Sequence, residues 1–413
     1  MNREARNQNE LAELALSGIN RDRLVRNTAD LIRGRGENPG GTEAETVRRL
    51  AALCAQLGAE VTVQEWAPGR PNLHAALGPF DGPALLFLGH SDVVPAGHGW
   101  SADPFDPRID EHHIIGRGAT DMKGGLAAVL EAMGAVHRVA PELRLELLCT
   151  ADEEDRAQGV AAWLAAATPR EYLGCIVAEP TDLDIVIGCR GASNFVVEIT
   201  GASAHAGRPE DGASSISAAA HLIDLVDRMH LEQRALPQDD VLGSATWNVG
   251  TVVGGTGTSM VPRSTTLTID RRTMPGEDPE HILSELLATA RDEIGGAPFA
   301  HAADVSLDGR VDMRMPGFRV PADDPLPQAA VAALTRLGEP VALTGWTAAC
   351  EGGFVAEFYR TPTIILGPGS ITDEAHQPDE KLAIAQLVTA AQAYVLVALS
   401  FLRDPQFPQI HAH

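Results

Sequence analysis

Two histidines and several carboxylates occupy positions from which they could bind metal ions. His90 and Asp92 follow the apolar run 84–88, which has the pattern of a buried parallel strand. Because alternate residues of a strand point to the same face, both side chains leave this segment in the same direction. The pair supplies a metal ligand beside a carboxylate that can orient it. Taken alone, the segment fits a buried histidine without a ligand role equally well.

Further candidates lie at or just beyond the ends of predicted strands or in a glycine-rich loop: Asp121, Glu153, Glu154, Glu179 and His376. Ligands in open α/β sheets gather at the carboxyl ends of the strands. Two histidines with three carboxylates suit Zn²⁺, with Co²⁺ or Mn²⁺ as substitutes, and one carboxylate could bridge two ions roughly 3.5–4 Å apart. Beside a metal, one of two adjacent glutamates can be a ligand and the other a base. Without a metal, adjacent acids fit the solvated first turn of a helix.

The order of the predicted elements indicates an α/β protein. Strands and helices alternate over 84–178, which is typical of a mostly parallel sheet with helical crossovers. Over 185–300 the order changes to strand, helix, strand, strand, helix, and the first pattern then returns. We therefore predict a discontinuous catalytic domain, residues 1–186 and 302–413, with a mostly parallel central sheet flanked by helices. An inserted α+β lid domain, residues 187–301, would carry an open strand edge available for pairing.

Charge and composition restrict the partners and the location. The 413 residues are too many for one simple core. The formal net charge is −24, and this negative charge makes nucleic acid and anionic membranes poor partners. Five scattered cysteines without a Cys-x-x-Cys pair favour a reduced protein. No run reaches the roughly 18 apolar residues of a membrane span. We predict a cytoplasmic protein without nucleic-acid or membrane partners.

Six motifs in order carry a resemblance to a known enzyme family. They are Gly89-His90-Ser91-Asp92-Val93-Val94-Pro95, Gly116-Arg117-Gly118-Ala119-Thr120-Asp121-Met122-Lys123-Gly124-Gly125, Asp152-Glu153-Glu154, Ala178-Glu179-Pro180-Thr181, Gly201-Ala202-Ser203-Ala204-His205-Ala206-Gly207-Arg208-Pro209, and Gly367-Pro368-Gly369-Ser370 through Ala375-His376-Gln377-Pro378-Asp379-Glu380. Over nearly its whole length the chain resembles the zinc aminoacylase family. That family includes acetylornithine deacetylase and succinyl-diaminopimelate desuccinylase, together with related carboxypeptidases.

The resemblance implies two zinc ions in each subunit and a role for each matching ligand. His90 and Glu179 would hold one ion, Glu154 and His376 would hold the other, and Asp121 would bridge them. The bland alternative for Asp121, a turn or helix cap, stays open on the sequence alone.

The resemblance also implies roles for residues that do not bind metal. Asp92 would orient His90 through its ring N–H, and Glu153 would act as general base and then as acid. His205 lies in the lid motif, which in relatives of this type reaches the active site of the partner subunit, so the resemblance implies a homodimer formed through the lid domain. Arg272 matches the position expected to grip a substrate carboxylate. By default, His205 would be an ordinary surface histidine.

Two further segments bear on the substrate. Ser259 stands where many relatives carry asparagine, and Glu351 with Gly352, in the segment 350–354, resembles the deacetylase branch. We therefore predict a two-zinc amidohydrolase that cleaves the amide of an N-acyl amino acid, as acetylornithine deacetylase does. A desuccinylase, or a carboxypeptidase or dipeptidase with the same metal site, is the alternative. An inactive, metal-stabilised binding protein is the alternative of another class, and the retained Glu153 speaks against it.

Overall fold

The computed structural model describes residues 3–403, which form two compact units. Unit 1 contains the described residues up to Gly188, Arg319–Gly345, and the residues from Glu351 onward; unit 2 contains Cys189–Phe318 and Trp346–Cys350. The lid domain was predicted to end at residue 301. Strand β12 (Ser306–Met315), however, pairs antiparallel with β9 (Gly191–Thr200), so this segment lies in unit 2. The prediction that it belongs to the catalytic domain was wrong.

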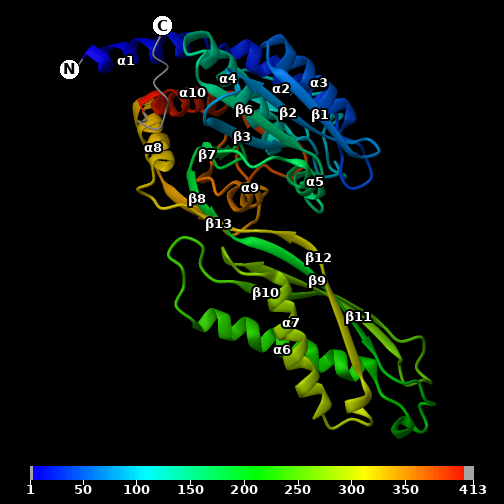
Figure 1. Ribbon diagram of the computed structural model, residues 1–413. Helices are drawn as coiled ribbons and strands as arrows, with labels where there is room; N and C mark the ends of the chain where they lie inside the picture. The colour runs from blue at the N-terminus through cyan, green and yellow to red at the C-terminus, as the bar shows by residue number, and fades with distance from the viewer. Residues whose placement is uncertain (1–2, 404–413) are drawn as a thin grey trace. The chain divides into compact units, whose positions relative to one another are not determined.

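A nine-stranded sheet forms the centre of unit 1, in the order β1-β2-β6-β3-β7-β15-β8-β13, with β14 paired to β8 (Figure 1). Neighbours among β6, β3, β7 and β15 pair in parallel, which confirms the predicted mostly parallel central sheet. The strands are β1 (Glu60–Ala67), β2 (Arg70–Leu77), β3 (Ala84–His90), β6 (Arg144–Thr150), β7 (Tyr172–Val177), β8 (Ile185–Cys189), β13 (Phe318–Arg319), β14 (Leu343–Trp346) and β15 (Thr363–Ile365).

Helices flank this sheet, and a small second sheet, β16-β5-β4, lies in the same unit. None of the helices between residues 3 and 403 is long and apolar enough to cross a bilayer. The helices are α1 (Arg3–Ser17), α2 (Arg21–Arg33), α3 (Ala44–Gln56), α4 (Gly124–Val139), α5 (Gln158–Ala166), α8 (Pro325–Leu337), α9 (Gly352–Tyr359) and α10 (Ile384–Ser400); the short strands are β4 (Arg108–Ile109), β5 (His113–Ile115) and β16 (Lys381–Ala383).

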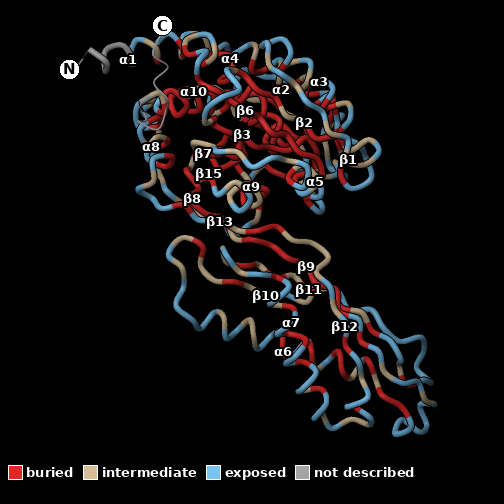
Figure 2. The backbone as a smooth tube through the Cα atoms, viewed as in Figure 1, coloured by how far each residue is buried: buried red, intermediate tan, exposed pale blue. Residues whose placement is uncertain are grey.

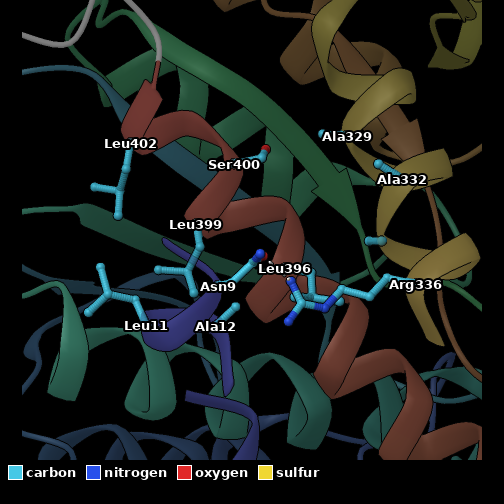
Figure 3. A pocket seen from close by; sticks show the side chains of 11 residues that line it. Asn9, Leu11, Ala12, Ala329, Ala332, Arg336, Leu396, Leu399, Ser400 and Leu402 are labelled. Carbon is cyan, nitrogen blue, oxygen red and sulfur yellow. Dashed lines mark hydrogen bonds between the residues drawn. The ribbon is translucent and has the colours of Figure 1, made fainter. Parts of the chain in front are cut away.

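The core of unit 1 lies along its central strands, of which β3 and β6 are buried throughout (Figure 2). All seven residues of β3 are buried, as expected for a parallel strand covered on both faces. A separate cavity of about 210 Å³ lies among α1, α8 and α10 (Figure 3). Its lining is largely leucine and alanine, and none of the predicted site residues contributes to it.

Unit 2 has a four-stranded antiparallel sheet in the order β10-β11-β9-β12. Strand β11 (Ser264–Thr273) alternates between buried and less buried residues, and its inward residues pack with α6 (Ser215–Ala235) and α7 (Pro279–Gly295) in one hydrophobic cluster. Strand β10 (Thr246–Gly254) forms one edge of the sheet and β12 the other.

Candidate metal centre and active site

Four parallel strands of unit 1 bring the predicted metal ligands to one edge of the sheet. His90 is the last residue of β3, and Glu154 and Glu179 follow the ends of β6 and β7. His376 lies in the loop after β15. Because these strands are parallel neighbours, their carboxyl ends meet at the same edge.

Asp121 lies between the two histidines. Its Oδ1 is 3.2 Å from Nε2 of His90, and its Oδ2 is 3.2 Å from Nε2 of His376. Glu179 Oε1 is 3.4 Å from Nε2 of His90, and Glu154 Oε2 is 3.2 Å from Nε2 of His376. The structure therefore brings together all five residues predicted as ligands, in two groups that share Asp121.

This donor set fits a pair of divalent cations. Each group offers one imidazole nitrogen, one glutamate oxygen and one oxygen of the shared Asp121, and these are the ligand types that zinc takes in proteins. Ligand atoms of His90, Asp121 and Glu154 all lie within 4.8 Å of one another. A carboxylate that offers one oxygen to each group has the arrangement needed to bridge two ions.

The electrostatics of the cluster also favour cations. Burial, together with the neighbouring acids, raises the pKa of both Glu179 and Glu154. Burial lowers the pKa of His90, but Glu179 and Asp121 outweigh this effect and raise it well above its ordinary value. Contacts with Asp121 and Glu154 raise the pKa of His376 to about 10. The acids thus favour positive charge at both imidazoles, and bound cations would supply positive charge at the same place.

Asp92 contacts both His90 and the segment that carries the predicted base. Nδ1 of His90 is 3.0 Å from the backbone oxygen of Asp92 and 3.5 Å from its carboxylate Oδ1. The same carboxylate accepts hydrogen bonds from the backbone N–H groups of Glu153 and Glu154, and from Asn38. Asp92 therefore links the end of β3 to the turn after β6, and the backbone carbonyl is the nearer partner of the imidazole.

Glu153, the predicted base, is close enough to the ligand cluster to be affected by its charges. Burial raises the pKa of Glu153 well above its ordinary value, and the carboxylates of Glu179 and Glu154 raise it further against the opposing effect of His90. A carboxyl group with a raised pKa is suited to accept and return a proton near neutral pH.

A buried ion pair beside the Asp121 loop was not predicted from the sequence. Nη1 of Arg117 is 2.7 Å from Glu380 Oε2, and both side chains are at most 2% exposed. Glu380 also accepts hydrogen bonds from the backbone N–H groups of Gly118, Thr120 and Asp121. Arg117 and Glu380 are both inside the quoted motifs, but their pairing spans 263 residues, which no local pattern indicates.

Of the predicted substrate contacts, Glu351 and Gly352 lie in unit 1, at the start of α9. Both are buried, and Glu351 is only 2% exposed. Its carboxyl group contacts the hydroxyl of Thr150 at the end of β6. Direct contact between Glu351 and a substrate is therefore not available in this structure.

The remaining candidates, His205, Ser259 and Arg272, lie in unit 2. His205 is exposed, and its Nδ1 accepts a hydrogen bond of 3.0 Å from the backbone of Gly207. Ser259 is exposed, and its backbone oxygen accepts from Ala206. The guanidinium of Arg272 is partly exposed and lies 3.2 Å from Asp270. A cavity of about 470 Å³ lies next to the His205 loop and is lined by Ala206, Glu210, Ser214 and Met260, among others.

Comparison with known proteins identifies the family. The model of peptidase family M20/M25/M40 matches residues 86–400. The chain belongs to this family. It is 30% identical to the acetylornithine deacetylase of Aliivibrio fischeri over 356 residues, which cover 83% of this chain and 87% of that protein. The resemblance stated from the motifs is thereby confirmed.

Solved structures of M20 proteins share the fold. Aminopeptidase PepT from Bacillus cereus matches with a TM-score of 0.72 and 24% identity, covering 94% of this chain and 100% of that one. The Bacillus subtilis protein YXEP, described as a dinuclear metal-binding peptidase of the M20 family, matches with a TM-score of 0.69 and 17% identity, covering 92% and 98%. Membership of a peptidase family confirms the prediction of an enzyme that hydrolyses amide bonds.

Proposed function

We propose that this M20 protein is a two-metal amidohydrolase that removes a small acyl group from an N-acyl amino acid, and that N-acetylornithine is the best candidate substrate. The observation that carries the proposal is Asp121, which offers one oxygen to each of two histidine–glutamate groups. The similarity to acetylornithine deacetylases supports the choice of substrate.

The proposed centre has His90 and Glu179 as ligands of one ion, Glu154 and His376 as ligands of the other, and Asp121 as the bridge. Zn²⁺ is the best candidate metal, with Co²⁺ or Mn²⁺ as substitutes. The chemistry that such ions supply when bound is polarisation of the scissile carbonyl and a lower pKa of the attacking water.

The chain itself would supply the proton transfers. Glu153 would take a proton from the attacking water onto its carboxylate and return it to the nitrogen of the leaving amine. Asp92 would keep the base in place, because it accepts hydrogen bonds from the backbone N–H groups of Glu153 and Glu154.

The proposed contributions of unit 2 are substrate binding and dimerisation. Arg272 would bind the substrate carboxylate, Ser259 would lie near the substrate, and His205 would stabilise the oxyanion in the partner subunit's site. Strand β10 supports a dimer because it is a sheet edge on which Val252 and Val253 are 54% and 71% exposed. None of the five cysteines, all of which lie within the described residues, forms a disulfide, and this supports a cytoplasmic location.

The experiment is a hydrolysis panel with the zinc- or cobalt-loaded protein. N-acetyl, N-succinyl and glutamyl substrates should be compared, and we expect the highest kcat/KM for an N-acetyl amino acid. Glu153→Gln should retain both metal ions while kcat falls by about 10²- to 10⁴-fold, the usual contribution of a general base. A higher kcat/KM for an N-succinyl or dipeptide substrate would show that the protein is a desuccinylase or a peptidase and not a deacetylase. No hydrolysis by a metal-loaded wild type would favour a binding protein.

A further inference from the structure

A buried carboxyl group close to the candidate metal centre has no role in the proposed chemistry. Glu351 precedes α9 and is 2% exposed. Its Oε2 contacts the hydroxyl of Thr150, whereas Oε1 has no hydrogen-bond partner among the residues that the structure describes. A carboxylate in this position would keep a buried negative charge with a single partner, which is costly.

The hydrogen bonds of Thr150 indicate the protonation state of Glu351. The Thr150 hydroxyl has one hydrogen, yet it lies within hydrogen-bonding distance of two groups, Glu351 Oε2 and, at 3.3 Å, the backbone oxygen of Gly89. A carbonyl oxygen only accepts. A full, unshared hydrogen bond with each group requires that Glu351 carries the proton and donates it to Thr150, which then donates to Gly89.

The surroundings of Glu351 agree with a neutral group. Burial raises the pKa of Glu351 to about 8, with Asp92 and Asp152 adding to the rise and Thr150 and His90 opposing it. Glu380 provides the contrast within the same unit. Burial raises the pKa of Glu380 to about 7, but its two oxygens accept from Arg117 and from three backbone N–H groups, which oppose that rise and favour the carboxylate.

Thr150 contacts the backbone on both sides of His90. Its hydroxyl reaches Gly89, the residue before His90, and its backbone oxygen accepts from both the backbone N–H (2.8 Å) and the hydroxyl (3.0 Å) of Ser91, the residue after it. We propose that Glu351, as a neutral carboxylic acid, is a positioning residue that acts through Thr150 to hold the end of β3 around His90. This inference rests on the proposed role of His90 as a metal ligand.

Two variants of Glu351 with nearly equal side-chain size test the proposal. The amide of Glu351→Gln can donate to Thr150, whereas Glu351→Met cannot. Zn²⁺ affinity of the full-length metal-free protein should be measured by competition with a chelator. We expect Glu351→Gln to bind within about threefold of wild type, and Glu351→Met to bind one of its two ions about 10- to 100-fold more weakly, as when a ligand loses its supporting contact. Equal losses in the two variants, or no loss in Glu351→Met, would overturn the proposal.

Variants of Thr150 test the same pathway independently. Thr150→Val removes the hydroxyl at nearly constant shape, and Thr150→Ser keeps it. We expect Thr150→Val to weaken metal binding as Glu351→Met does, the double variant to be no weaker than either, and Thr150→Ser to stay near wild type. Additive losses in the double variant would contradict a shared pathway.

The two proposals can fail separately. A wild-type protein that binds no metal overturns the proposed function. A wild-type protein that binds two ions, but whose Glu351→Gln variant binds as poorly as Glu351→Met, overturns only the role of Glu351. Unfolding of each metal-free variant by urea shows whether a loss of affinity comes from a loss of fold.

Discussion

Replacing Glu380 by glutamine should both destabilise unit 1 and weaken the metal centre. Glu380 accepts four hydrogen bonds from donors around the Asp121 loop, one of them from the buried Arg117. Glutamine keeps one acceptor oxygen and turns an NH₂ group toward the other donors, so two of the four bonds are lost. At about 1.5–3 kcal/mol for each bond to a charged group, the free energy of unfolding should fall by about 3–6 kcal/mol. This range includes the cost of leaving Arg117 without its counter-ion, about 3–5 kcal/mol.

The matched control for this prediction is the neighbouring residue. Asp379 is 39% exposed and pairs with Arg108, which is 43% exposed, so Asp379→Asn should lower the free energy of unfolding far less than Glu380→Gln does. Urea unfolding of the metal-free proteins measures both changes, and competition with a chelator should show about 10- to 100-fold weaker metal binding for Glu380→Gln alone. If Glu380→Gln were no more destabilising than Asp379→Asn, the hydrogen bonds of Glu380 would not support the Asp121 loop.

Three further predictions concern pH, metal and subunit exchange. Burial raises the pKa of Glu146, but contacts with His74 and Arg144 lower it to about 2 from 4.5. The contribution of ionised Glu146 to the free energy of unfolding is therefore complete above pH 4.5 and is lost as the pH falls toward 2, about 3 kcal/mol in all. In the Glu146→Gln variant, the free energy of unfolding measured with urea should depend less on pH over this range. Removal of metal by a chelator should abolish hydrolysis and lower the melting temperature. Zinc added back at 100 times its Kd should raise the free energy of unfolding by about 2.7 kcal/mol. An unchanged melting temperature would argue against a metal in the folded core. Equal amounts of His205→Ala and Glu153→Ala proteins should be mixed under conditions of subunit exchange. If His205 acts across a dimer, about a quarter of wild-type activity should return, because half of the dimers are mixed and each of these has one complete site. No recovery in verified mixed dimers would argue that His205 acts within its own chain.

The sequence predicts the parallel sheet well because the sheet depends on local patterns, such as the apolar run before His90. Four of the five candidate ligands lie at or after the ends of parallel strands, whose carboxyl ends meet at one edge, so their proximity follows from the same patterns; Asp121 lies instead in the turn before α4. That residues 306–315 belong to unit 2 was not predicted, because most of them are exposed or half-buried and show no clear hydrophobic alternation. Pairing with β9, not composition, assigns them to unit 2.

The roles of Arg117, Glu380 and Glu351 could not be predicted, since each depends on contacts between segments far apart in the chain. The Glu351–Thr150 contact joins residues 201 positions apart, and the sequence indicates neither the burial of the carboxyl group nor the number of donors around it. The substrate contact expected for Glu351 therefore rested on the resemblance of segment 350–354 to the deacetylase branch. Its burial and hydrogen bonds favour a positioning role instead.

The different environments of the buried glutamates follow from the charge that the centre must carry. The negative charge around the two histidines, from Asp121, Glu154 and Glu179, is more than can be buried without positive partners. Bound cations would supply those partners. Burial also raises the pKa of Glu380, to about 7, but Arg117 and three backbone N–H groups donate to this carboxyl group and favour its charged form. Glu351 has no such donors, and Asp92 and Asp152 raise its pKa. A neutral acid at this position can therefore support the end of β3 without adding to the repulsion that bound metal ions must offset.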